Sequence, residues 1–220
     1  MRVIAIDGPA GSGKSTVARA LAARLGLDYL DTGAMYRAVA FAALRRGVDP
    51  DDVDAVARLA QQVDIAVSDI VCVDGVDATI EIRGPEVTRA VSAVAANPEV
   101  RRELRRRQRE WADKHHGGVI EGRDIGSVVF PAAELKVYLT ATDSERAGRR
   151  SKEVLDMDYD AVAADIARRD YADSSRSAAP LVVAEGAKLV DTTGLSVDQV
   201  VERVLELLPA LAPGPPDGER

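Results

Sequence analysis

The sequence predicts an α/β protein whose core is a parallel sheet wrapped by helices. Three observations lead to this fold class. Short apolar runs alternate along the chain with stretches of helical apolar spacing, and a glycine-rich segment joins the first run to the first of these stretches. The length of 220 residues suits one compact domain with small appendages, or at most two small domains, and is enough to bury a core without disulfides or structural metals. The single cysteine, Cys72, excludes an internal disulfide framework and is expected to be a buried strand thiol.

The first half of the predicted core follows from β-branched runs, helical spacing and caps. Gly26 is placed to end a helix as a C-cap, and Asp31 or Thr32 is placed to cap the next one. In chain order the expected elements are a strand at residues 2–6, a helix over Lys14–Leu25, a strand at 28–30, and helices at 31–46 and 53–63.

The pattern changes after this last helix, where three short β-rich runs lie close together at 65–68, 70–74 and 79–83. Asp74 and Gly75 form a dipeptide that is typical of turns. Parallel strands need a long crossover connection, so runs this close together predict a small antiparallel insert.

Alternation of helices and strands resumes in the second half of the chain. A charged helical stretch over 144–170 has few large apolar residues and can bury little surface, which predicts a mobile lid. Residues 213–220 are expected to form a frayed tail. The other expected elements are helices at 87–94 and 98–111, the second capped by Asn97, strands at 119–120, 135–139 and 187–190, and a final helix after Ser196.

The charge balance limits the possible partners. The formal net charge is −7, which disfavours a dedicated nucleic-acid coat, yet 24 of the 29 cationic residues are arginine. Arginine recognises phosphate and carboxylate groups through paired hydrogen bonds, but a GC-rich genome would produce the same excess, and both explanations stay open. No secretory segment or membrane-length apolar run is evident, so we expect a soluble, cytoplasmic protein.

The motif that carries the chemistry is Gly8-Pro-Ala-Gly-Ser-Gly-Lys-Ser15, which fits G-x-x-x-x-G-K-[ST] between a predicted strand and a predicted helix. Its glycines let backbone N–H groups surround a phosphate at a helix N-terminus, while Lys14 adds positive charge and the Ser15 hydroxyl is a ligand for Mg²⁺. We therefore expect a P-loop NTPase fold that binds a nucleoside triphosphate. The expected phosphate-binding residues are Gly8, Pro9, Ala10, Gly11, Ser12, Gly13, Lys14, Ser15 and Thr16.

A P-loop alone does not separate kinases from switches and motors. A switch GTPase would need an N-K-x-D motif, which the sequence lacks, and a motor would need a longer chain. A small-molecule kinase needs a second anion pocket. Arg37 and, later, Arg123 with Asp124 follow expected strands and would lie at the ligand-facing edge of the sheet. As an alternative, Arg37 would be a solvated helix charge.

Two further groups of arginines are ambiguous. Of the six arginines at 101–109, Arg101 lies beside the apolar stripe of its helix, and most of the others look solvated. The arginines spaced over 146–176 would either close over transferring phosphates or belong to an ordinary ion-paired surface helix.

With these motifs in place, the sequence resembles the bacterial cytidylate kinases, a family of nucleoside-monophosphate kinases. The resemblance implies a five-stranded parallel sheet, a helical lid, and a monophosphate-binding region enlarged by the antiparallel insert. Glu121 departs from the family, where aspartate is common, and residues 150–170 follow no matching pattern. The matching blocks are 6–15, 30–37, 91–98, 106–108, 121–126, 128–131 and 169–181.

The resemblance also implies roles for matching positions. The acceptor phosphate would be held by Arg37, Arg123 and Arg176. Cytosine would be read by Ser92, Arg101 and Asp124, whose donors and acceptors suit its exocyclic amine, N3 and O2. The remaining substrate contacts would come from Arg169 and Asp173 at the sugar, and from Thr32 and Tyr36. The catalytic cations would be Lys14, Arg123, Arg149 and Arg150, the last two covering ATP from the lid.

The expected reaction is in-line transfer of the ATP γ-phosphoryl group to CMP, and to dCMP, with Mg²⁺ as cofactor. Alternatives are a P-loop kinase for another nucleoside monophosphate or small metabolite, and a non-enzymatic nucleotide-binding switch. We expect a monomer that binds neither nucleic acid nor membrane. The expected organisation is one kinase domain over 1–212, with a core at 1–50, 118–145 and 178–212, a monophosphate-binding region at 51–117 and a lid at 146–177.

Overall fold

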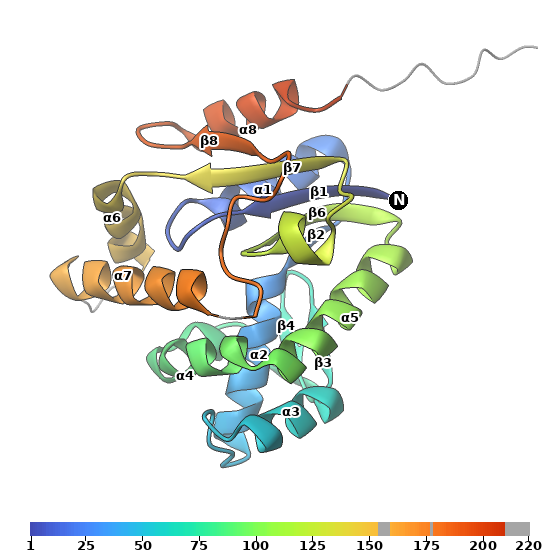
Figure 1. The fold of residues 1–220 in the computed structure, drawn as a ribbon, viewed down its shortest axis with the longest axis vertical. Helices are drawn as coiled ribbons and strands as arrows, with labels where there is room; N and C mark the ends of the chain where they lie inside the picture. The colour runs from blue at the N-terminus through green and yellow to red at the C-terminus, as the bar shows by residue number, and fades with distance from the viewer. Residues whose placement is uncertain (154–158, 177, 210–220) are drawn as a thin grey trace, which may run out of the picture.

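The structure, a computed structural model, describes residues 1–153, 159–176 and 178–209. The tail expected at 213–220 lies outside these residues, as do 154–158 and 177 of the expected lid region. The described chain forms a large sheet covered by helices, a small second sheet, and a pair of helices at the end of the large sheet to which the strand arrows point (Figure 1).

The large sheet has five strands, all paired in parallel. Its central strand places Ala5 opposite Ile120 on one side and Lys136 on the other. Because this strand is covered on both faces, residues 3–7 are all buried, which explains its uninterrupted apolar run. The predicted five-stranded parallel sheet is confirmed. The strand order is β2 (Tyr29–Asp31), β6 (Gly117–Gly122), β1 (Arg2–Asp7), β7 (Leu135–Thr140), β8 (Lys188–Asp191).

Side chains of β1 alternate between two hydrophobic cores. Ile4 and Ile6 pack in a core with α1 and α8, whereas Val3 and Ala5 pack in a core with α2, α4 and α5. The period of two along the strand therefore decides which helices it contacts. Helix α3 packs on α2 and α5. The helices are α1 (Lys14–Leu25), α2 (Thr32–Arg45), α3 (Val53–Gln62), α4 (Pro85–Ala96), α5 (Pro98–Lys114) and α8 (Val197–Glu206).

Side-chain caps fix the helix starts at the predicted places. Asp31, and not Thr32, caps α2, since its Oδ1 accepts a hydrogen bond from the Ala34 N–H at 2.9 Å. Asn97 caps α5 by accepting hydrogen bonds from the first turn, and Ser196 begins a capping box on α8. Each cap satisfies backbone N–H groups that the helix itself leaves without acceptors.

The small sheet is antiparallel, as predicted, but its third strand is not at 79–83. Asp74 and Gly75 have φ values of 50° and 76°, which form a two-residue hairpin turn and return the chain at once. The third strand therefore follows this turn directly, and residues Glu81–Arg83 form a short 3₁₀-helix, η1. The three strands are β3 (Ile65–Val67), β4 (Val71–Val73) and β5 (Val76–Asp77). Cys72 lies on β4 as a free thiol and is half-buried, less enclosed than expected.

Two arginines of the run in α5 have structural partners that the sequence did not predict. Arg107 donates hydrogen bonds to the Ala60 and Val63 carbonyl oxygens at the end of α3, both at 2.8 Å. Arg109 donates to the carbonyl oxygen of Val129, which ends a π-helical turn, η2 (Ile125–Val129). Arg107 is half-buried and does not fit the expectation that most of this run is solvated, whereas Arg109 is exposed as expected. Both satisfy carbonyl groups that helix ends leave unpaired.

The charged stretch after β7 is helical, as predicted. It forms α6 (Asp143–Glu153) and α7 (Tyr159–Ser175), which pack against each other (Figure 1). Their small apolar cluster, Ala147, Val162 and Ile166, includes Ala10 from the loop between β1 and α1. None of the described helices is long and apolar enough to cross a membrane.

Candidate active site

A cavity of about 420 Å³ lies where the carboxyl ends of β2 and β6 meet the loop after β1. Its walls come from this loop, α2, η1, α4, α5, β6 and the helices α6 and α7. The rule that ligands bind at the carboxyl ends of parallel strands therefore located it correctly. All ten substrate residues expected from the sequence line it: Thr32, Tyr36, Arg37, Ser92, Arg101, Arg123, Asp124, Arg169, Asp173 and Arg176.

The glycine-rich loop, residues 8–15, forms one wall of the cavity. At Gly8 the φ angle is 151°, and a Cβ atom there would lie 2.2 Å from the Leu139 carbonyl oxygen, so only glycine fits. Lys14 begins α1 and is buried, and its Nζ donates to the Pro9 carbonyl oxygen at 2.6 Å. Of the nine residues expected to bind phosphate, six line the cavity: Ala10, Gly11, Gly13, Lys14, Ser15 and Thr16. Gly8, Pro9 and Ser12 are not among its lining residues in the described chain.

Positive charge dominates the cavity, although the whole chain is acidic. Eight cationic side chains line it against four carboxylates. Burial, together with repulsion from Arg169, Arg150 and Arg83, lowers the pKa of Arg37 to about 9. Burial and the Arg123 charge likewise lower the pKa of Lys14 to about 7. Cations that destabilise one another in this way are stabilised by a multiply charged anion, such as a polyphosphate.

Arg37 is not a solvated helix charge. Its side chain is buried, and Nη1 donates to the Ile82 carbonyl oxygen at 2.9 Å and to the Thr88 hydroxyl at 3.0 Å. These contacts join α2 to η1 and α4, and α2 also packs on β3 and β4, so the helix that carries Arg37 connects the cavity with the small sheet.

Arg101 and Asp124 form a buried ion pair at the end of the cavity away from Lys14. Arg101 Nη2 lies 2.5 Å from Asp124 Oδ2, and the Arg101 guanidinium stands 5.5 Å from the centre of the Tyr36 ring. Its Nε has no hydrogen-bond acceptor among the described residues, and the same is true of the buried Arg176 Nη2. Buried donors without acceptors are costly, so these two N–H groups favour a ligand at this end.

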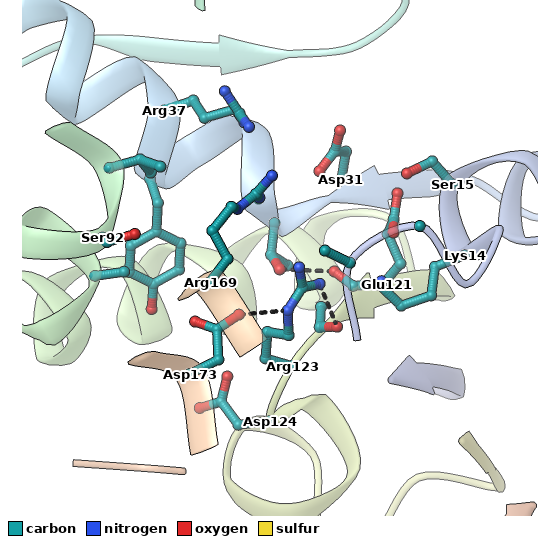
Figure 2. A pocket seen from close by; sticks show the side chains of 18 of the residues that line it. Lys14, Ser15, Asp31, Arg37, Ser92, Glu121, Arg123, Asp124, Arg169 and Asp173 are labelled. Carbon is teal, nitrogen blue, oxygen red and sulfur yellow. Dashed lines mark hydrogen bonds and ion pairs between the residues drawn. The ribbon is translucent and has the colours of Figure 1, made fainter. Parts of the chain in front are cut away.

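Arg123 connects the two ends of the cavity. Its Nε donates to Asp173 Oδ2 at 2.8 Å, and it stands between Lys14 and Glu121 on one side and Ser92 on the other (Figure 2). Burial raises the pKa of Asp173, but the Arg123 charge and hydrogen bond outweigh it, so the pKa stays below its usual range. The carboxylate is therefore ionised and holds Arg123 in place.

The two lid arginines that were expected to cover ATP differ in position. Arg150 lines the cavity. Arg149 is not among the described lining residues. It donates to the Thr192 hydroxyl at 2.8 Å and to the Thr192 carbonyl oxygen at 2.7 Å, and it lies beside Gly13. This anchors α6 to the chain after β8.

Several site residues were not predicted from the sequence. Arg83 of η1 lines the cavity and pairs with Asp31 at 3.2 Å, and no sequence pattern indicated it. Glu121 also lines the cavity, where burial and the Asp31 charge raise its pKa. Its position at a strand end beside Arg123 could have indicated it. Asp7 lies behind the loop and accepts hydrogen bonds from the Ile125 and Gly126 N–H groups, while burial raises its pKa to about 6.

Comparison with known proteins identifies the family. A family model described as "Cytidylate kinase" matches residues 4–210. The chain belongs to the cytidylate kinase family. It is 48% identical to the cytidylate kinase of Corynebacterium efficiens, over 96% of this chain and 95% of that protein. It is 48% identical to that of Mycobacterium avium, over 94% of both chains, and 47% identical to that of Desulfitobacterium hafniense, over 93% of this chain and 91% of the relative.

Solved structures with low identity share the fold. An uncharacterized protein from Eubacterium ventriosum aligns with a TM-score of 0.54 at 13% identity, covering 94% of this chain and 97% of that one. TT1252 from Thermus thermophilus aligns with a TM-score of 0.50 at 21% identity, covering 94% and 95%. The predicted P-loop NTPase fold and the predicted family are both confirmed, and the chain is a nucleoside-monophosphate kinase that uses ATP as phosphoryl donor.

Proposed function

We propose that this enzyme transfers the γ-phosphoryl group of ATP to CMP, and also to dCMP, with Mg²⁺. The observation that carries the proposal is that one cationic cavity joins a P-loop to the buried Arg101–Asp124 pair. The family match over residues 4–210 supports the same reaction, and no observation favours another acceptor or a non-enzymatic switch.

The residues near Lys14 suit Mg²⁺. Ser15, Asp31 and Glu121 line the same part of the cavity and offer hydroxyl and carboxylate oxygens, the ligands that this ion prefers (Figure 2). Ser15 would hold the ion, which usually keeps phosphate and water oxygens in the rest of its shell. When bound, Mg²⁺ supplies charge neutralisation at the terminal phosphates.

The proposed mechanism is direct, in-line transfer. The CMP phosphate is already anionic, so it needs no strong general base, and catalysis comes from positioning and charge stabilisation. Lys14, Arg123 and Arg150 would neutralise the transferring group. Arg149 would act with them from the lid, once it leaves Thr192. Arg37 and Arg176 would hold the acceptor phosphate together with Arg123.

The base and sugar would lie against the opposite end of the cavity. Cytosine presents an amine donor next to two acceptors, which matches the Asp124 carboxylate beside the donors of Arg101 and Ser92. Tyr36, whose ring centre lies 5.5 Å from the Arg101 guanidinium, completes this wall. Thr32 would contact the substrate from beside the end of β6, where its hydroxyl donates to the Glu121 carbonyl oxygen. Arg169 and Asp173 would contact the sugar, with Asp173 kept ionised by Arg123.

A coupled assay of ADP release with CMP, dCMP, UMP and AMP tests the proposal. We expect CMP and dCMP to be the preferred acceptors, and strong preference for AMP or for none of the four would contradict it. Arg123→Ala should lower kcat with CMP far more than it weakens ATP binding. The matched control is Arg168→Ala, on the exposed side of α7, which should leave both unchanged.

We further propose that the enzyme is a cytoplasmic monomer acting on free nucleotides. We propose core segments at 1–50, 118–145 and 178–212, a monophosphate-binding region at 51–117 and a lid at 146–177. Arg37 lies on α2, which also packs on β3 and β4, and this packing supports assigning the insert to the monophosphate side. Sedimentation of the full chain at enzyme-assay concentrations tests the oligomeric state.

A further inference from the structure

Ala10, in the glycine-rich loop, is held through both of its backbone polar groups by the lid helices. Its N–H donates to Asp170 Oδ1 on α7 at 3.0 Å, and its carbonyl oxygen accepts from Arg146 Nη1 on α6 at 3.0 Å. Arg146 Nη1 also pairs with Asp170 Oδ2. Two charged side chains from two helices thus close a ring of hydrogen bonds on one residue of the loop. We call Arg146, Asp170 and Ala10 the Ala10 clamp.

The packing around the Ala10 clamp is close. The Ala10 side chain is buried with Ala147, Val162 and Ile166 of the lid helices. The adjacent Gly11 approaches α6 so closely that a Cβ atom there would lie 2.8 Å from the Arg146 carbonyl oxygen. The loop and the lid helices therefore meet through both apolar contact and charge-assisted hydrogen bonds, which are stronger than neutral ones.

The two charged side chains of the Ala10 clamp lie outside the cavity. Neither Arg146 nor Asp170 is among the described residues that line the cavity. Each lies close in sequence to residues that do line it: Arg150 follows on α6, and Arg169 and Asp173 flank Asp170 on α7. A shift of either helix relative to the loop would move these side chains away from a phosphate bound at Lys14.

We propose that Arg146 and Asp170 are positioning residues: by gripping Ala10, they set the distance between the lid arginines and the phosphates held by the loop. This proposal rests on the proposed function, since it concerns the geometry of that phosphoryl transfer. Phosphoryl transfer depends almost wholly on positioning and charge, and displacement of a catalytic group by about 1 Å can cost roughly 100-fold in rate.

The test compares two substitutions of Asp170 in the full chain. Asp170→Ala removes both the acceptor and the charge, whereas Asp170→Asn keeps an oxygen that can accept the Ala10 N–H. We expect kcat to fall at least about tenfold in Asp170→Ala, with KM for both ATP and CMP raised. In Asp170→Asn, which keeps the acceptor for Ala10 but loses the charge that pairs with Arg146, we expect a smaller fall of more than about twofold. A simple ion pair would predict equal losses in the two variants.

Asp143→Asn is the matched control. Asp143 also pairs with Arg146, at 2.6 Å, but its side chain is 94% exposed and the contact does not involve Ala10. We expect its kcat and both KM values to stay within about twofold of wild type, as for other exposed ion pairs. An equal loss in Asp143→Asn and Asp170→Asn would overturn the proposal.

Amide hydrogen exchange at Ala10 gives a readout that needs no substrate. Exchange should be faster in Asp170→Ala than in wild type and Asp143→Asn, and unchanged exchange in Asp170→Ala would overturn the clamp. If Asp170→Ala does not fold, Asp170→Asn decides by kcat: a value within twofold of wild type is contrary to the proposal. Wild-type enzyme unable to phosphorylate CMP would overturn the proposed function alone, because the exchange comparison would still test the clamp.

Discussion

Asp124→Asn perturbs the buried ion pair while preserving the shape of the side chain. Arg101 and Asp124 are 2% and 8% exposed, with 2.5 Å between Nη2 and Oδ2. After the substitution, the Arg101 guanidinium would keep two neutral neighbours, the Ala95 carbonyl oxygen at 3.1 Å and the Tyr36 ring. The Arg101 Nε has no hydrogen-bond acceptor among the described residues even before the substitution. The guanidinium charge would thus remain buried without the carboxylate that compensates it.

The expected cost follows from this burial. Removal of one member of a buried ion pair costs about 3–5 kcal/mol, because the other charge stays uncompensated. Asparagine can still accept a hydrogen bond from Arg101, so we expect the lower end, about 3 kcal/mol. Arg101→Met should cost a similar amount. In the double variant neither charge remains, and its cost should be less than the sum of the single costs by about 2 kcal/mol.

Urea unfolding followed by far-UV circular dichroism measures these free energies for wild type, both single variants and the double variant. Additive single costs, within about 0.5 kcal/mol, would refute the reasoning, because they would show that the two side chains do not stabilise each other. The ratio of kcat/KM for CMP to that for UMP separates structure from recognition. If Asp124 also contacts the cytosine amine, this ratio falls in Asp124→Asn even under conditions where the enzyme is fully folded.

The remaining predictions concern a proton, a helix end and the cavity wall. Because the pKa of Lys14 is lowered to about 7, its amine is largely neutral at pH 8 and charged at pH 6. Bound phosphate favours the charged form of the Lys14 amine, so the enzyme should take up most of a proton when it binds ATP at pH 8. Calorimetry in buffers of different ionisation enthalpy measures this uptake. Binding without proton uptake would contradict the assigned pKa. Arg107→Ala should lower the free energy of unfolding by about 2 kcal/mol, because its hydrogen bonds to the end of α3 are lost. The control Arg102→Ala removes a side chain that is 70% exposed and should change the free energy of unfolding by less than about 0.5 kcal/mol. Equal effects of the two substitutions would refute the capping role of Arg107. Arg83→Ala should lower kcat/KM for CMP by at least about fivefold and leave the free energy of unfolding unchanged. Arg46→Ala is the control, since Arg46 forms an exposed ion pair outside the cavity, and it should not lower kcat/KM. Activity retained in both variants would show that Arg83 does not contact a phosphate.

The sequence predicted local features best where all the interacting atoms lie within one short segment of the chain. The hydrogen bond from Ala34 to Asp31 and the capping of α5 by Asn97 depend only on neighbouring residues, so the sequence was sufficient for them. The glycine-rich loop was predicted for the same reason, because its left-handed φ angles and its helix N-terminus lie within one short motif.

The third strand of the insert shows where local pattern was insufficient. Residues 79–83 contain β-branched side chains, but the turn at Asp74 and Gly75 ends after two residues and pairs Val73 with Val76. The geometry of the turn, and not the β propensity of residues 79–83, therefore determines which residues form the third strand.

The roles of the many arginines can be distinguished only in the folded structure. Arg37, Arg123 and Arg176 line the cavity, which fits phosphate recognition. Arg107 and Arg109 bind backbone carbonyl groups of other elements, a task that neither phosphate recognition nor codon usage explains. Their partners lie on α3 and η2, and nothing in the spacing of the run indicates which arginine meets which carbonyl group.

By itself, the sequence determined the alternation of strands and helices, which follows from periodicity and caps, and the P-loop with its Lys14 and Ser15. The rule that parallel strands present their carboxyl ends at one edge placed Arg37 and Arg123 at the site, and the resemblance to the family supplied the other substrate residues that line the cavity. Only the tertiary structure decided the strand order, the pairing of Arg101 with Asp124, and the grip of Arg146 and Asp170 on Ala10. The physical reason is that each of these joins atoms on separate elements, as far apart as 160 positions between Ala10 and Asp170, and their contact is set by how the helices pack on the sheet.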